Sequence, residues 1–314
     1  MSISETRKPI VVVGSINMDL VAHTPHIPVP GQTVIGTGFD TTPGGKGANQ
    51  AVAAARLGYP VAMVGAVGAP SADSLDVFGQ ALLDNLARAG VDTSAVARVS
   101  GPSGVAPILV DEKGQNSIVV VPGANAKVDT AAVDRQAPLI RSAGMVLCQL
   151  ELPLETVRRV LAICAEAVVP VMLDPAPAAP LDDTVFRQTA WFTPNETEAA
   201  FYLGVASQTE DAARRLLDKG LKGVVLKRGA DGAFVALAGG KAAWVKPFQV
   251  QAIDTVGAGD CFNGAFAVAL LEGSNPWDAA RFASAAAAIS VTRSGAQASM
   301  PTRTKVDAFL AARK

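Results

Sequence analysis

A glycine turn and a carboxylate stand at the expected start of an apolar helix in the stretch Asp254 to Asp260, which reads Asp-Thr-Val-Gly-Ala-Gly-Asp. The first N–H groups of a helix lack backbone partners and carry a partial positive charge, so they attract phosphate. Gly257 and Gly259 let the backbone approach a ligand closely. A carboxylate there would repel phosphate, but it makes sense if Asp260 takes a proton from an alcohol that attacks phosphorus. The alternative is an ordinary aspartate cap on a buried helix, which explains Asp260 but not both glycines.

A second polar group has members in two places, after the first expected strand and in a glycine-rich loop further along the chain. Its members are short hydrogen-bonding side chains at strand ends and a helix start, namely Asn17, Asp19, Lys46 and Asn49. Such a set suits a polyhydroxylated small molecule, whose hydroxyls need several fixed donors and acceptors. The loop is not a P-loop, because glycine follows Lys46, and a single Gly14 after the strand does not make a dinucleotide fingerprint. Taken by itself, the loop is an ordinary glycine turn with a surface lysine.

Two weaker motifs follow other expected strands. Asn195 and Glu198 are three residues apart and share one helical face. A carboxylate near a triphosphate can hold hydrated Mg²⁺ through its waters, although such a pattern is more often a helix cap. The turn Lys227 to Gly232 could meet the phosphates or the base edge of a nucleotide, and its alternative is a simple β-turn.

Composition excludes several classes of protein. The chain has 314 residues, 49% of them hydrophobic and 18% charged, with a net charge of −1. This is enough apolar material for a large core, and it lacks the basic footprint of a nucleic-acid-binding protein. We expect no signal peptide and no membrane span. The three cysteines fit a reducing cytoplasm, and for Cys261 we favour packing over a reactive thiol.

The chain alternates short apolar strands with helices, which predicts an α/β fold with a mostly parallel central sheet and helices on both faces. The expected strands are Ile10–Val13, Val61–Val64, Met145–Leu150, Val169–Leu173, Trp191–Thr193 and Val224–Lys227. The expected helices are Ala48–Leu57, Ser74–Ala89, Leu154–Ala167, Glu196–Leu203, Thr209–Lys219, Cys261–Leu271 and Trp277–Thr292.

Two segments, about 16–40 and 98–122, break this rhythm. The second contains a β-hairpin candidate, with strands at Val105–Val110 and Ser117–Val121 around a turn. Together they predict a small extra sheet that covers a ligand as a lid. The alternative is that they are edge strands of the main sheet. We expect one domain over residues 1–314, with the lid inserted into it.

These motifs together resemble the ribokinase-like (PfkB) family of sugar kinases, over nearly the whole chain from Val11 to Phe309. The segment Gly44–Ala51 is similar to the family's N-terminal signature, and Asp254–Asp260 is similar to the C-terminal one. The segment Thr193–Glu198 resembles the family's Asn-x-x-Glu motif. The resemblance implies a Rossmann-like core with a β-sheet lid that often pairs two subunits. It also implies ATP-dependent transfer of the γ-phosphoryl group to the primary hydroxyl of D-ribose.

The resemblance also implies roles for individual residues. Asp260 would be the catalytic base, beside an anion hole made by the backbone of Gly257, Ala258 and Gly259. The sugar would be bound by Asn17, Met18, Asp19, Gly44, Gly45, Lys46, Gly47, Asn49, Glu151 and Asp260. The nucleotide would be bound by Asn195, Lys227, Arg228, Gly229, Ala230, Asp231, Gly232, Gly259, Asp260 and Ser284. Glu198 would help to hold Mg²⁺. A K⁺ ion would lie near Asp254, Val256, Ser290, Arg293, Gly295 and Ser299.

Other functions stay open on the sequence. A nucleoside kinase is disfavoured because the expected lid contains Phe39 and neither Trp nor Tyr. A sugar-phosphate kinase is disfavoured because residues 15–40 contain neither Arg nor Lys. Deoxyribose, fructose or another small sugar remains possible, since one hydroxyl contact can separate such substrates. An NAD-linked dehydrogenase is disfavoured because this chain lacks the glycines of a dinucleotide-binding motif. A sugar-binding protein without catalytic activity is disfavoured because it would not need Asp260.

Overall fold

The computed structural model describes residues 7–71 and 74–313 and has a central sheet of ten strands. The strands run in the order β14-β13-β12-β11-β10-β9-β1-β4-β5, and β6 also pairs with β4. All the pairs are parallel except β12–β13 and β13–β14. The bounds are β1 Ile10–Val13, β4 Val61–Ala69, β5 Val91–Asp92, β6 Val96–Ser100, β9 Met145–Cys148, β10 Val171–Leu173, β11 Trp191–Phe192, β12 Gly223–Lys227, β13 Ala233–Leu237 and β14 Ala242–Val245.

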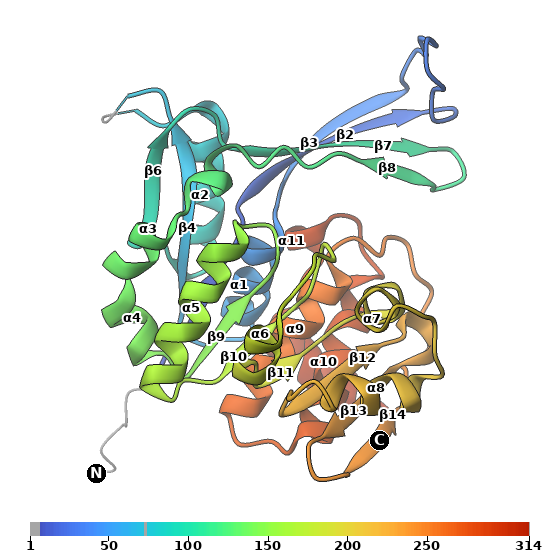
Figure 1. Ribbon diagram of the computed structural model, residues 1–314. Helices are drawn as coiled ribbons and strands as arrows, with labels where there is room; N and C mark the ends of the chain where they lie inside the picture. Colours follow the sequence, from blue (N-terminus) through green and yellow to red (C-terminus); the bar gives the residue numbers. More distant parts are fainter. Residues whose placement is uncertain (1–6, 72–73, 314) are drawn as a thin grey trace.

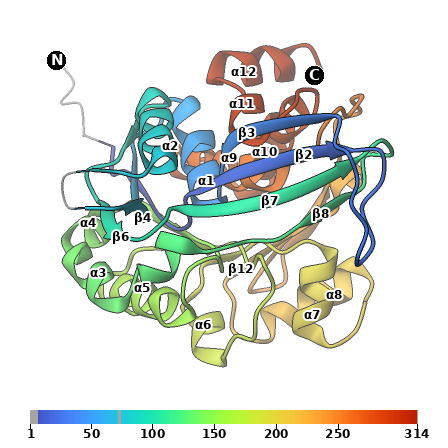
Figure 2. The same ribbon diagram turned by 90° about the horizontal axis from the view of Figure 1, so that it is seen from above.

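Helices cover both faces of this sheet, as Figure 2 shows. Strand β1 explains why, because Ile10 and Val12 enter one apolar core while Val11 and Val13 enter the other. One face carries α1 Lys46–Arg56, α2 Val77–Arg88, α9 Ala258–Leu271, α10 Pro276–Ser290 and α12 Arg303–Ala311, with the short α11 Ala296–Ser299 nearby. The other carries α3 Thr130–Arg135, α4 Ala137–Ser142, α5 Leu154–Ala167, α6 Asp183–Gln188, α7 Glu196–Leu203 and α8 Thr209–Leu217. The expected parallel α/β architecture is confirmed.

A second, four-stranded sheet extends away from the body of the molecule (Figure 1). Its order is β3-β2-β7-β8, with bounds β2 Asn17–Thr24, β3 Gly38–Gly44, β7 Gly104–Asp111 and β8 Asn116–Ile118. Strands β2 and β7 are parallel, whereas β2–β3 and β7–β8 are antiparallel. The predicted hairpin and separate small sheet are therefore confirmed, and the alternative of main-sheet edge strands is wrong. That this sheet acts as a lid stays a prediction.

The boundaries differ from expectation at several elements. Strand β3 continues to Gly44, past the expected limit of 40, and residues 98–100 belong to β6 of the main sheet. Helix α9 begins at Ala258 rather than Cys261, so Asp260 lies inside its first turn. Helix α2 begins at Val77 because the Asp76 side chain accepts a hydrogen bond from Gly79 N and caps it. Strands β13 and β14 and helices α3, α4, α6 and α12 had no predicted counterpart.

The cysteines and the apolar helices have simple structural roles. Cys148, Cys164 and Cys261 are buried and unbonded. Cys261 is 1% exposed and packs in the apolar core, which confirms its packing role, and burial raises the pKa of its thiol to about 12. In the described part of the chain, no helix is both long and apolar enough to cross a bilayer.

Candidate active site

Asp260 lies in the first turn of α9 at the edge of the central sheet. Gly257 caps this helix with φ of 72°, a conformation that favours glycine. Within residues 7–71 and 74–313, the backbone N–H groups of Gly257, Gly259 and Asp260 have no hydrogen-bond partner. The Asp260 side chain itself is buried, with 6% exposure. Ala258 N, which was also predicted for the anion hole, instead donates to Thr255 O at 3.2 Å. The turn thus brings free N–H donors of Gly257, Gly259 and Asp260 and a shielded carboxylate to one place.

Both carboxylate oxygens of Asp260 are held by amides of α1. Asn49 Nδ2 donates to Oδ2 at 2.9 Å, and Gln50 Nε2 donates to Oδ1 at 3.1 Å. Burial raises the pKa of Asp260, and Asp174 adds to this, whereas Lys46 and the two amides oppose it. A carboxylate with a raised pKa is a stronger base for a proton than an exposed one.

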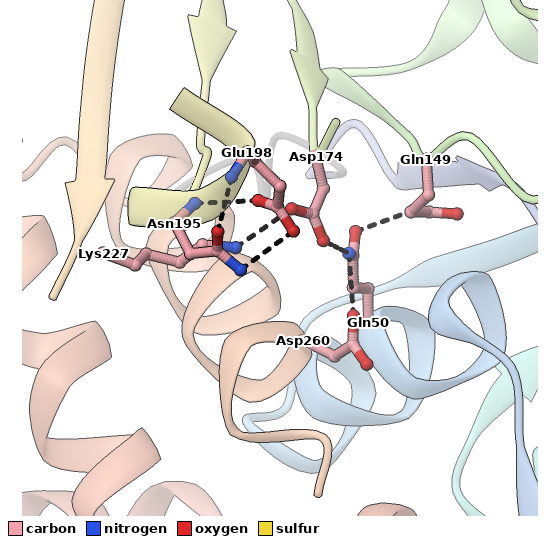
Figure 3. A network of polar contacts seen from close by, with 7 residues as sticks. All are labelled: Gln50, Gln149, Asp174, Asn195, Glu198, Lys227 and Asp260. Atoms are coloured by element: carbon pink, nitrogen blue, oxygen red, sulfur yellow. Dashed lines mark hydrogen bonds and ion pairs between the residues drawn. The ribbon is translucent and has the colours of Figure 1, made fainter. Parts of the chain in front are cut away.

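Asp260 also belongs to a polar network that the sequence did not indicate, drawn in Figure 3. Gln50 Nε2 also donates to Asp174 Oδ2 at 3.0 Å, and Gln149 Nε2 donates to Gln50 Oε1 at 2.8 Å. Lys227 Nζ lies 3.0 Å from Asp174 Oδ1. Asp174 directly follows β10, so its place at the carboxyl end of a parallel strand was a usable signal. Gln149 directly follows β9 and carried the same signal.

Lys227 reaches from the end of β12 to the start of α9. A Cβ built on Gly259 would lie 3.5 Å from Lys227 Nζ, so the ammonium group lies beside the free N–H groups. A lysine and several helix-start amides in one place can neutralise a phosphoryl group.

An apolar cavity of about 300 Å³ opens next to this helix start. Six of the predicted nucleotide residues line it, namely Lys227, Gly229, Ala230, Gly232, Gly259 and Ser284. The other four, Asn195, Arg228, Asp231 and Asp260, do not line it, and Arg228 instead forms ion pairs with Glu196 and Asp231. Apolar wall residues that the sequence did not indicate complete it, among them Pro247, Phe248, Val250, Phe262 and Val291. The cavity suits a ligand that joins an apolar ring to phosphates.

The predicted sugar-binding residues gather where β2, β3 and α1 meet. Asn17 is buried, and its Oδ1 accepts from Asn125 Nδ2 at 2.7 Å, a partner that sequence reasoning missed. Asp19 packs against Gly44, where an added Cβ would lie 2.2 Å from Asp19 Oδ2, so only glycine fits. The Met18 side chain instead joins the apolar core, which leaves its backbone for any ligand contact.

Three further predicted positions hold the loop before α1. Glu151 Oε2 accepts from Ser15 Oγ at 2.5 Å and from Lys46 N at 3.2 Å. Gly45 caps the helix with φ of 86°. A Cβ on Gly47 would lie 2.7 Å from the backbone of Gly14. These contacts fix the position of Lys46 and Asn49 on the first turn of α1.

The charges at this site are strongly coupled. Burial raises the pKa of Asp19 to about 7, and Glu151 and Asp260 add to this, while Lys46 opposes it. For Lys46, burial alone would lower the pKa, but Asp260, Asp174, Glu151 and Glu198 outweigh it and raise the pKa above its usual value. Lys46 is therefore a permanent cation among acids.

We expect Asp19→Asn to raise the Tm of the unliganded protein by a few degrees at pH 8 and by less at pH 5. The pKa of Asp19 is about 7 in the folded protein against 3.8 ordinarily, so its ionisation destabilises the fold increasingly as pH rises from 4 to 7. Between pH 5 and 8 this amounts to ~3 kcal/mol. Thermal unfolding at both pH values measures the effect. The exposed Asp84→Asn on α2 is the control, and equal Tm shifts at the two pH values would contradict the prediction.

Asn195 and Glu198 form a capping box at the start of α7. Glu198 N donates to Asn195 Oδ1 at 2.8 Å, and Asn195 N donates to Glu198 Oε2 at 2.7 Å. Burial raises the pKa of Glu198, and Lys227 opposes this. Asn195 and Glu198 thus cap α7, and the Glu198 carboxylate faces the ion pair of Lys227 and Asp174.

The residues predicted for K⁺ come from the loop before α9, the last residue of α10, the loop after it and the last residue of α11, and Asp254 joins the two loops. Asp254 Oδ1 accepts from Val256 N at 2.9 Å, and Oδ2 accepts from Gly295 N at 2.7 Å. Ser290 and Ser299 are buried, and their hydroxyls donate to backbone carbonyls, which leaves oxygen lone pairs free for a cation. Among the described residues, no group of three His, Cys, Asp or Glu side chains could hold a metal ion.

Comparison with known proteins agrees with this geometry. The model for the pfkB family carbohydrate kinases matches residues 7–303. The chain is 42% identical to a ribokinase of Haemophilus influenzae over 97% of this chain and 99% of that one. It is 44% identical to a ribokinase of Bacillus subtilis over 96% and 99%. The structure of an Arabidopsis thaliana ribokinase complexed with ribose and ATP superposes with a TM-score of 0.90 at 35% identity, covering 97% of this chain and 99% of that one. This chain therefore belongs to the pfkB family of carbohydrate kinases.

Proposed function

We propose that this protein transfers the γ-phosphoryl group of ATP to the 5-hydroxyl of D-ribose, giving D-ribose 5-phosphate and ADP. The observation that carries the proposal is the buried Asp260 carboxylate beside free helix-start N–H groups. Asp19 and Lys46 are close enough to interact with its charge, and its neighbour Gly259 lines the apolar cavity. The relatives named ribokinase at 42% and 44% identity support ribose as the acceptor.

In this proposal each group has a chemical task. Asn17, Asp19 and Asn49 bind the sugar hydroxyls and turn the 5-hydroxyl toward Asp260. Asp260 accepts the hydroxyl proton while the oxygen attacks the γ-phosphorus and the bond to the bridging oxygen of ADP breaks. The free N–H groups at the start of α9 and the Lys227 ammonium stabilise the charge on the transferred group. The base and ribose of the nucleotide occupy the cavity beside Ser284 and the Gly229–Gly232 turn.

We also propose two cations. Glu198 would hold a hydrated Mg²⁺, which supplies charge neutralisation for the phosphates. Its half-buried carboxylate near Lys227 and Asp174 supports this, because Mg²⁺ keeps several waters and needs few protein ligands. Asp254, Val256, Ser290, Arg293, Gly295 and Ser299 would hold K⁺ under the helix start, mainly through oxygens, as hard cations prefer.

We further propose a cytoplasmic homodimer that pairs through the second sheet. Phe39 and Ile118 in that sheet are 64% and 50% exposed, and Val119 to Val121 beside β8 are also exposed. Phe39 lies on β3 and Ile118 on β8, the two edge strands of this sheet, and exposed apolar residues on edge strands are often covered by a partner. The three free cysteines fit the reducing cytoplasm.

Sugar-dependent ADP release tests the function. Purified protein with ATP, Mg²⁺ and K⁺ is assayed with D-ribose, 2-deoxyribose, fructose and adenosine. We expect kcat/KM to be highest for D-ribose and no ADP release above background without sugar. The second candidate is 2-deoxyribose, because a deoxyribokinase of Salmonella typhi is 37% identical over 96% of this chain. A higher kcat/KM for 2-deoxyribose than for D-ribose would make 2-deoxyribose the proposed substrate. No ADP release with any of the four compounds would contradict the proposed function.

A further inference from the structure

Two chains of side-chain amides end on Asp260, one on each carboxylate oxygen. The inner members are Asn49 and Gln50, which donate to Oδ2 and Oδ1. Behind each stands one glutamine. Gln297 Nε2 donates to Asn49 Oδ1 at 3.0 Å, and Gln149 Nε2 donates to Gln50 Oε1 at 2.8 Å. Both outer glutamines are buried, with 3% and 0% exposure.

The direction of the first chain is fixed at both of its ends. Gln297 Nε2 also lies 3.3 Å from the carbonyl oxygen of Gly44, which can only accept a hydrogen bond. The NH₂ group of Gln297 must therefore face this side, and Asn85 Nδ2 donates to its Oε1 at 2.5 Å on the other. Since Asn49 receives a donor at Oδ1, its own NH₂ group turns to Asp260.

The second chain is fixed at its inner end, by Gln50 (Figure 3), whereas Gln149 Oε1 at its outer end is buried and has no hydrogen-bond partner among the described residues. Gln50 Nε2 faces two carboxylates, Asp174 Oδ2 at 3.0 Å and Asp260 Oδ1 at 3.1 Å. Gln149 occupies Gln50 Oε1, so turning the Gln50 amide over would set NH₂ against NH₂. The same turn would set a carbonyl oxygen against two carboxylates, and both contacts would be repulsive.

We propose that Gln149 and Gln297 are positioning residues for the phosphoryl transfer. They keep the NH₂ groups of Gln50 and Asn49 on Asp260, and these donors hold the carboxylate ionised and in a fixed orientation. The charged and titratable groups that otherwise act on Asp260 come from other elements and stay in place, namely Lys46 of α1, Asp19 of β2, Asp174 after β10 and Cys261 of α9.

The inference rests on the proposed kinase activity and is tested by variants of both glutamines. Gln297→Glu and Gln149→Glu keep the shape of the side chain but remove its NH₂ group. We expect kcat to fall at least ~10-fold. KM for ATP should stay within about 3-fold, because neither residue lines the cavity. The acid limb of the kcat–pH profile should move to higher pH, because Asn49 and Gln50 are then no longer held in the orientation in which they donate to the ionised Asp260.

Neutral variants separate the effect of losing the NH₂ group from the effect of adding a negative charge. Gln297→Met and Gln149→Met lack the NH₂ group without adding a carboxylate, so we expect the same direction of change in kcat and in the pH profile. The matched control is Gln80→Glu, since Gln80 donates to Asp84 on the exposed surface of α2; its kcat should equal that of wild type. Folding is checked by thermal unfolding.

The outcomes separate the positioning role of the two glutamines from the proposed kinase function. Folded methionine variants of both glutamines with wild-type kcat and an unchanged pH profile would overturn the positioning role. A wild-type protein that releases no ADP with any sugar would overturn the proposed function instead. A fall in kcat without a change in the KM for ATP supports the inference.

Discussion

Replacing Asp260 with asparagine should lower kcat at least ~10²-fold while ribose binding stays within about 3-fold of wild type. The amide has no basic oxygen for the hydroxyl proton. It also places an NH₂ group where Asn49 or Gln50 already donates, so the side chain can satisfy only one of these partners. Steady-state kinetics gives kcat, and calorimetric titration with ribose gives the affinity.

A matched substitution separates chemistry from helix electrostatics. Asp278→Asn changes an aspartate in the first turn of α10, where it accepts from Asn275 Nδ2 at 2.6 Å. It removes the same charge from the same kind of position outside the site. We expect its kcat to match that of wild type. Equal turnover by Asp260→Asn and wild type would exclude Asp260 as the base.

Gly257→Ala should lower kcat about 10²-fold by displacing the helix-start N–H groups, since small misplacements of catalytic groups have effects of this size. Gly257 has φ of 72°, and an added Cβ would lie 3.0 Å from the Cβ of Ala296. Relief of that contact moves the first turn of α9 away from α11. Because Asp260 lies in the same turn, both the anion site and the base shift. Steady-state kinetics measures the loss.

The other end of the same helix supplies the control. Gly273 follows α9 with φ of 92°, and a Cβ there would meet no atom within 4 Å. Gly273→Ala therefore carries the backbone strain without the clash. We expect both variants to lose stability, by about 1–2 kcal/mol from strain, and only Gly257→Ala to lose kcat. A similar kcat for the two variants would show that the position of this turn does not matter.

The sequence indicated the residues that lie close together along the chain. The order Gly257, Gly259, Asp260 follows from the local rules of a helix start, and Lys46 and Asn49 lie within one turn of α1. Short apolar runs with little alternation indicated strands buried on both faces, and these strands formed the parallel sheet. Helix caps such as Asp76, which accepts from Gly79 N, set the exact boundaries of the helices.

The partners of those residues were decided by the tertiary structure. Asp174 and Gln149 reach Gln50 from strand ends 124 and 99 residues away, and Gln297 reaches Asn49 from 248 residues away. Their contacts depend on strand order and on how α9 and α11 pack against α1, for which a single sequence carries no periodic or local signal. The tertiary structure also decided that β2 and β7, which are far apart in the sequence, pair in parallel and so build the second sheet. The sequence by itself therefore determined the fold class and indicated Asp260 and the helix-start amides beside it, whereas only the folded chain decided which buried amides hold the Asp260 carboxylate.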